Sequence, residues 1–195
     1  EAYLRALSIE IEQSAPMLEG LEVSTVYVGG GTPTWISVTQ LDGLLHQIAD
    51  SFPLASDVHL NIESTPADMT PEMASMLGGH GLDRITLGIQ ALDEKLLASV
   101  NRPQSMDQVA AAVEALRDAS VKWINFDLVA GLPGDTVESF KAGFASLLEL
   151  QPDMVHTYPY TERPGHASNP EKQAIVDTAR AMMTDAGMRS LPHDG

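Results

Sequence analysis

Polar groups that could bind a ligand occur where short apolar runs of this chain end. Glu63, Gln90 and Asp127 each close such a run, and three consecutive glycines, Gly29–Gly31, follow another. Single polar residues often mark strand ends, but four of five runs ending this way favour a site. Because a carboxylate at the edge of an apolar segment is costly to desolvate without a partner, hydroxyls or an amine of a ligand are suitable partners for Glu63 and Asp127. We therefore expect a site for a small polar molecule.

The glycine run is longer than a turn requires. Glycine adopts positive φ and, having no Cβ, lets another molecule approach its backbone closely. A tight turn between strand and helix needs one or two glycines, so three in a row expose consecutive N–H and C=O groups to a ligand. The run matches neither GxGxxG nor a Gly-Lys-Ser/Thr phosphate loop. The segment "GLPGDT" at 131–136 is interpreted instead as a turn that shapes a helix entry.

The elements that position these residues alternate between strand and helix. Apolar periodicity predicts strands at 25–28, 57–63, 84–90, 123–129 and 154–158. Apolar periodicity also predicts a helix at 2–13. Helix-start signals predict helices at 71–79 and after Ser37, Ser105, Asp135 and Asn169. Repeated strand–helix units imply a parallel sheet, whose strands end at a common edge where ligands collect. Five strands are too few for an eight-stranded barrel, so among α/β folds we expect a partial barrel rather than a doubly wound sheet.

Composition excludes several classes of protein. The 195 residues are 44% hydrophobic, enough for one core. The net charge of −16, from 11 basic and 27 acidic residues, argues against nucleic acid as a partner. No apolar run is long enough for a membrane span, and no signal segment opens the chain. We expect a single domain over 1–195 and a cytoplasmic location.

The six histidines, at 46, 59, 80, 156, 166 and 193, show no metal-ligand spacing, so no metal site is predicted. His59 and His156 lie within predicted strands. We interpret them as core residues rather than ligands.

Six segments taken together resemble one group of enzymes. They are "VYVGGGTPTWIS", "IESTP", "RITLGIQALDEKLL", "NRPQS", "INFDLVAGLPGDT" and "YPYTERPG", and they cover about residues 1–165. Their order and spacing resemble those of the radical S-adenosylmethionine (SAM) proteins that include the oxygen-independent coproporphyrinogen III oxidases and the related heme chaperones. "YPYTERPG" is closer to the chaperone branch, and residues 166–195 match weakly.

The resemblance implies a partial (β/α)6 TIM-like barrel of radical SAM type, with SAM lying across the strand ends. Matching positions imply a SAM-binding set of Gly30, Gly31, Thr32, Glu63, Gln90, Arg102, Asp127 and Thr161. The backbone of 30–32 would hold the methionine end, and Glu63 would bind the ribose. The backbone of Thr161 would lie at the nucleoside.

The chain departs from the family in one respect. The family holds a [4Fe–4S] cluster with a Cys-x3-Cys-x2-Cys loop after its first strand, and this chain has no cysteine. By alignment, that strand and loop would lie before Glu1. The expected fold therefore lacks the first strand, and the cluster and its electron donor belong to the intact parent only.

The function implied is the core of a radical SAM enzyme similar to oxygen-independent coproporphyrinogen III oxidase. In the intact parent it would generate a 5′-deoxyadenosyl radical and act on a porphyrin- or heme-related small molecule. The alternatives are a heme-binding chaperone of the same family and a radical SAM methyltransferase relative. An unrelated barrel enzyme that uses Glu63 and Asp127 as acid and base also remains open.

Overall fold

The computed structural model describes residues 1–91, 93, 96–97, 104–162 and 167–190. Its elements are, in chain order, α1 (Ala2–Ser14), η1 (Ala15–Leu18), β1 (Val23–Val28), η2 (Pro33–Trp35), α2 (Val38–Ser51), β2 (Leu54–Ser64), α3 (Pro71–Gly79), β3 (Leu82–Gln90), α5 (Met106–Asp118), β4 (Trp123–Ala130), α6 (Val137–Glu149), β5 (Met154–Pro159) and α7 (Lys172–Asp185). The longest of these helices have 14 residues. In this part of the chain no helix is long and apolar enough to cross a membrane.

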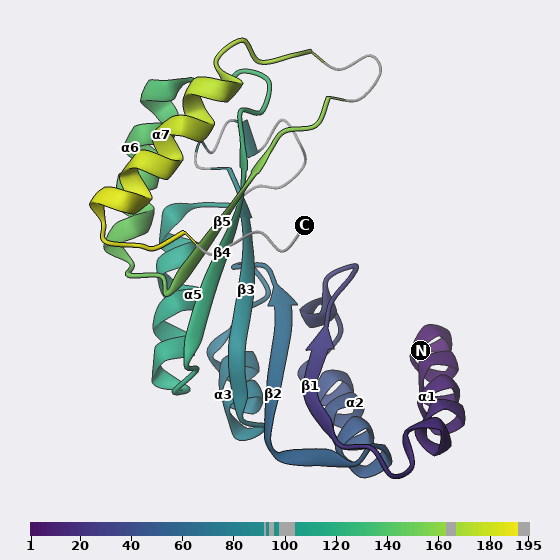
Figure 1. The fold of residues 1–195 in the computed structure, drawn as a ribbon. Coiled ribbons are helices and arrows are strands. Elements are labelled where there is room, and N and C mark those ends of the chain that lie inside the picture. Colours follow the sequence, from purple (N-terminus) through teal and green to yellow (C-terminus); the bar gives the residue numbers. More distant parts are fainter. Residues whose placement is uncertain (92, 94–95, 98–103, 163–166, 191–195) are drawn as a thin grey trace.

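The five strands form one parallel sheet in the order β1-β2-β3-β4-β5. Each strand pairs with the next one along the chain, and a helix connects every pair (Figure 1). A doubly wound sheet would reverse its strand order and carry helices on both faces. The unbroken order and the half-barrel arrangement confirm the expected partial barrel.

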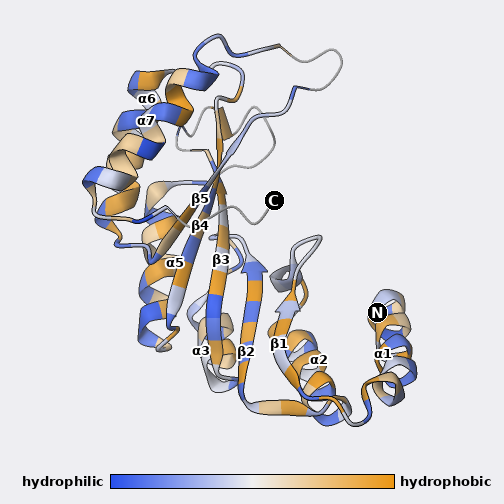
Figure 2. Ribbon diagram, in the orientation of Figure 1, coloured by the Kyte–Doolittle hydropathy of each residue, from blue (hydrophilic) through white to orange (hydrophobic). Residues whose placement is uncertain are grey.

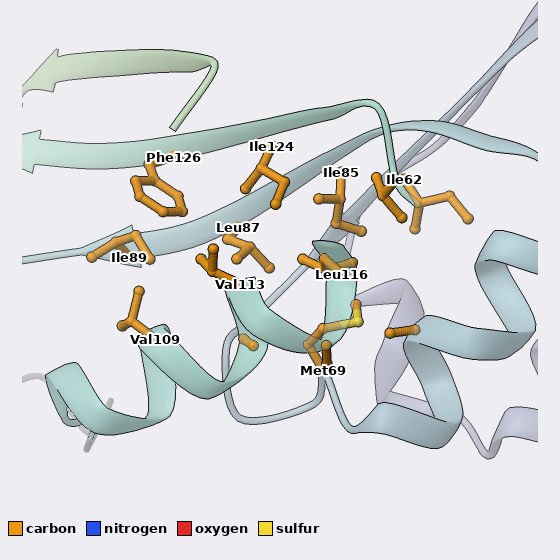
Figure 3. Close-up of a cluster of buried hydrophobic side chains, with 14 of the residues drawn as sticks. Ile62, Met69, Ile85, Leu87, Ile89, Val109, Val113, Leu116, Ile124 and Phe126 are labelled. Atoms are coloured by element: carbon orange, nitrogen blue, oxygen red, sulfur yellow. The ribbon is translucent and has the colours of Figure 1, made fainter. Parts of the chain in front are cut away.

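The core lies between the sheet and its helices. Hydrophilic and hydrophobic residues alternate along β2, β3 and β4 (Figure 2), so one face of each strand is apolar. Ile85, Leu87 and Ile89 of β3 pack with Ile124 and Phe126 of β4 in the main core cluster (Figure 3). These side chains face α5, which contributes the buried residues Val109, Val113 and Leu116. The opposite face of the sheet is left for polar side chains.

Two predicted helix starts are wrong by one or two residues. The N-cap of α6 is Thr136, whose hydroxyl accepts from the backbone N–H of Ser139, and not Asp135. Asn169 does not begin α7, since Glu171 is its N-cap. The Asn169 amide instead donates to the carbonyls of Leu132 and Asp135, at 2.6 and 2.9 Å, and so holds the 131–136 turn in place.

Candidate functional site

The candidate site lies on the face of the sheet that the helices do not cover. Strand alternation turns a polar set toward this concave face: Tyr27, Asn61, Glu63, Arg84, Thr86, Asn125, Asp127, His156 and Tyr158. Their strand neighbours, such as Ile62 and Phe126, are buried in the core on the other side. The polar alternation of the strands therefore builds one continuous polar surface on which we place the candidate site.

Two different constraints favour glycine at the three positions after β1. A Cβ on Gly29 would lie 2.6 Å from Cε1 of Tyr27 and 3.1 Å from the Glu63 carboxyl carbon, so side-chain contact excludes it. Gly30 and Gly31 adopt φ of +82° and +73°, a region that other residues rarely enter. A Cβ on either would meet nothing within 4 Å, so their backbone faces open space.

Glu63 joins this glycine turn to the sheet. One carboxylate oxygen accepts a 2.5 Å hydrogen bond from the Tyr27 hydroxyl, and the other accepts from the Gly30 backbone N–H at 3.1 Å. Partial burial of the phenol, followed by its hydrogen bond to Glu63, raises the pKa of Tyr27 to about 12. Glu63 is thus fixed beside the exposed backbone of the turn.

Asp127 lies in a second polar group two strands away. Its Oδ1 accepts from the Asn125 amide at 3.0 Å and lies 3.2 Å from Nδ1 of His156. Asn125 is 1% exposed, and its Oδ1 has no hydrogen-bond partner among the described residues. The pKa of Tyr158 is raised by partial burial, with the charges of Asp127 and Glu63 adding to the effect.

Gln90 reaches the same face because its backbone adopts a left-handed conformation. At the end of β3 the register shifts between Gly88 and Gln90, and Gln90 has φ of +68°. Its side chain folds back over Gly88, because a Cβ on Gly88 would lie 2.7 Å from the Gln90 amide nitrogen. Gly88 pairs with Asp127 on β4. The Gln90 side-chain amide, which lies over Gly88, is therefore next to the strand position of Asp127. Such strained backbone is typical of ligand-binding positions.

Among the residues of the SAM set, the structure joins Gly30 directly to Glu63 and puts Gln90 and Asp127 on neighbouring strands. The charge of Asp127 contributes to the raised pKa of Tyr27, so the two groups lie within electrostatic range of each other. Thr161 lies in the loop beyond β5 and is exposed. Arg102 falls outside the described residues.

The sequence pattern did not assign several residues of this face to the site, among them Tyr27, Gly88, Asn125 and His156. Alternation within "INFDLV" could have found Asn125, which shares a face with Asp127. The interpretation of His59 and His156 as core residues is wrong. Their side chains are 61% and 42% exposed, because both project from the uncovered face of the sheet.

Comparison with known proteins agrees with this geometry. The chain matches the radical SAM superfamily over residues 8–144. It is 31% identical over 164 residues to the oxygen-independent coproporphyrinogen III oxidase of Escherichia coli, covering 84% of this chain and 36% of the relative. It is 34% identical over 158 residues to the heme chaperone HemW of Lactococcus lactis, covering 81% of this chain and 41% of the relative.

Structural comparison gives the same result. The chain is similar to the structure of coproporphyrinogen III oxidase (HemN) from Escherichia coli, which is described as a radical SAM enzyme. The match has a TM-score of 0.88 and 28% identity, and it covers 95% of this chain and 46% of the HemN chain. The chain thus spans less than half the length of these relatives. The family match covers 137 of the 195 residues, from 8 to 144, and the half-barrel fold agrees with it. The chain belongs to the radical SAM superfamily.

Proposed function

We propose that this chain is the SAM-binding core of a radical SAM protein that acts on a porphyrin- or heme-related molecule. The observation that carries the proposal is the fixed contact of Glu63 with a glycine turn in which a Cβ on Gly30 or Gly31 would meet nothing within 4 Å. SAM combines an amino acid, a ribose and a sulfonium cation. A site with free backbone groups and carboxylates suits all three.

Each residue of the set has a distinct binding task in this proposal. The backbone of residues 30–32 accepts the methionine end, and at Gly30 and Gly31 no side chain blocks its approach. Glu63 has two hydrogen bonds from the protein, and an ionised carboxylate can accept about four. Its remaining capacity is available to the ribose hydroxyls, and Gln90 and Asp127 bind on the opposite side.

The chain fits the nucleoside but not the iron–sulfur cluster. Radical SAM proteins use SAM together with a [4Fe–4S] cluster, which is held by cysteine thiolates, and this sequence has none. SAM beside a reduced cluster supplies a 5′-deoxyadenosyl radical that abstracts hydrogen from a substrate. We assign binding and orientation of SAM to the present residues and derive no radical step from them.

Calorimetric titration of the chain with SAM tests the binding proposal. Glu63→Gln removes the negative charge and keeps the shape of the side chain, so we expect at least tenfold weaker binding. Glu114→Gln is the matched control, because Glu114 is exposed on α5, on the helix side of the sheet. Absence of binding at millimolar SAM in folded protein, or equal affinity of the two variants, would contradict the proposal. The second result would favour an acid–base role for Glu63.

Two further observations support the porphyrin-related substrate class. Two relatives are named coproporphyrinogen III oxidase and heme chaperone. Within the described part of the concave face, Arg84 is the one guanidinium or ammonium group, and the residue is partly exposed. Such a donor suits a substrate carboxylate. Arg84→Met should therefore weaken binding of a carboxylated porphyrin, measured by fluorescence quenching, more than it weakens SAM binding.

A heme chaperone is the second candidate function. His156 and Tyr158 lie next to each other on β5, with ring centroids 6.2 Å apart, and both are accessible on the concave face. Histidine and tyrosine are both known axial ligands of heme iron. A shifted Soret band on heme addition, lost in His156→Ala or Tyr158→Phe, would favour this function. A Soret band identical to that of free heme would count against it.

A further inference from the structure

A second group of chemically active side chains lies away from the concave face, between α2 and the end of α3. Asp42 and His46 are one turn apart on α2, and His80 is the residue that caps α3. Nε2 of His80 lies 2.8 Å from Oδ1 of Asp42, and Nδ1 of His46 lies 3.4 Å from the same oxygen. One donor atom from each residue lies within 4.8 Å of the other two.

The end of α3 and a hydrogen bond to Asp42 fix the position of His80. The N–H of His80 bonds to the carbonyls of Met76 and Leu77, at 3.2 and 3.1 Å, so its Cα is fixed by the end of α3. The His80 side chain is only 16% exposed, and its ring meets that of His46 edge to face at 4.7 Å. The His80 hydrogen bond, the largest influence, holds the pKa of Asp42 below its usual value. The end of α3 and the hydrogen bond to Asp42 therefore hold the His80 ring in position.

We propose that Asp42, His46 and His80 bind a divalent transition metal of the Zn²⁺ type and thereby link α2 to the end of α3. Two imidazoles with one carboxylate are ligands that suit zinc and its neighbours, whereas Mg²⁺ and Ca²⁺ prefer oxygen ligands alone. Three protein ligands leave a fourth tetrahedral position for water. The assignment is independent of SAM binding, because the two sites lie on opposite sides of the sheet.

The geometry needs only small movements to close around an ion. With zinc–nitrogen and zinc–oxygen distances of about 2.0–2.2 Å, tetrahedral donor atoms lie about 3.3–3.5 Å apart. The His80–Asp42 and His46–Asp42 separations, 2.8 and 3.4 Å, are already near that range. The His46 side chain is 64% exposed, so its ring is free to turn a nitrogen toward the ion. Its Nδ1 lies 3.0 Å from the backbone carbonyl of Asp42, a contact that the ring would give up on binding the ion.

The sequence could not reveal this group by spacing, because Asp42 and His46 are separated from His80 by a strand and a helix. Packing of α2 beside α3 brings them together. The same chain supplies a natural control. His59 also lies beside a carboxylate, with 3.6 Å between its Nδ1 and Oδ2 of Asp83, but it belongs to no group of three ligands among the described residues.

Titration of the untagged chain with Zn²⁺ by calorimetry, and with Co²⁺ by visible absorption, tests the proposal. The absence of cysteine removes thiolates as competing ligands. We expect one ion per chain, with binding at least tenfold weaker in His80→Gln and in His46→Gln and unchanged in His59→Gln. The exposed His46 position keeps the test valid if His80→Gln fails to fold. Lack of a one-to-one site in the wild type, or equal loss in His59→Gln, would overturn the proposal.

Discussion

Substitution of two glycines at opposite ends of β1 separates backbone strain from ligand contact. Gly20 and Gly30 have φ of +81° and +82°, and a Cβ on either would meet nothing within 4 Å. Gly20 precedes β1 and Gly30 follows it, and six strand residues span about 20 Å. The two positions are therefore matched in conformation and surroundings, but only Gly30 lies in the proposed SAM site.

The expected cost in stability is the same for Gly20→Ala and Gly30→Ala. Left-handed backbone costs an L-residue about 1–2 kcal/mol, and the reduced freedom of the unfolded chain returns about 0.4–1 kcal/mol. A net loss of about 1 kcal/mol lowers Tm by roughly 2–4 °C for a chain of this size. Urea unfolding of both variants measures this loss and verifies that the strain is equal.

The expected effect on SAM binding differs between the two variants. The alanine methyl at 30 occupies the open space that the methionine end requires, so affinity should fall at least tenfold, which is about 1.4 kcal/mol. Gly20→Ala should bind SAM as the wild type does. Calorimetry on both proteins decides the matter. If the two variants bind SAM equally, the glycine turn does not hold the ligand, and the reasoning from its open backbone is refuted.

Three other predictions follow from the same contacts. The pKa of Tyr27 is raised from 10.0 to about 12 in the folded state, so its stabilising contribution is present below pH 10 and is lost as the pH rises from 10 to 12. Urea unfolding across this range should show a smaller loss in Tyr27→Phe than in the wild type, and equal losses would contradict the assignment. Gln90→Gly relieves a φ of +68° and should raise the unfolding free energy by up to about 1 kcal/mol while weakening SAM binding; unchanged affinity would remove Gln90 from the site. Phe126→Ala empties a fully buried position and should cost about 3–5 kcal/mol in chemical denaturation, whereas a cost below about 1 kcal/mol would show that the core repacks freely.

The sequence predicted the parallel sheet and the common edge at which we place the candidate site, because both follow from periodicity. Apolar alternation located all five strands, and the carboxyl ends of parallel strands necessarily meet. Contacts that depend on strand register were not predictable in this way. The Tyr27–Glu63 hydrogen bond joins residues 36 apart and requires Tyr27 to pair with Asn61. The return of Gln90 over Gly88 depends on a local register shift that has no signature in the residue pattern.

The same limit explains why the helix starts were misplaced. Asp135 and Thr136 are both good N-cap residues, so composition alone does not choose between them. The structure uses Thr136 as the cap and leaves Asp135 buried, with Ser139 donating to its carboxylate. Tertiary burial, rather than local preference, decides which of the two begins α6.

In the proposed SAM site, the two hydrogen bonds of Glu63 would keep its carboxylate oriented for a charged ligand. An unpaired carboxylate among apolar strands would be costly, yet one paired with an arginine would have to break that pair on binding. Glu63 instead accepts hydrogen bonds from a phenol and a backbone N–H, two neutral donors that do not neutralise its negative charge. The charge therefore remains available to the sulfonium nucleoside, while the two hydrogen bonds fix the carboxylate in place. Glu63 can bind without giving up either partner, so the glycine turn and the carboxylate are already oriented before the ligand arrives.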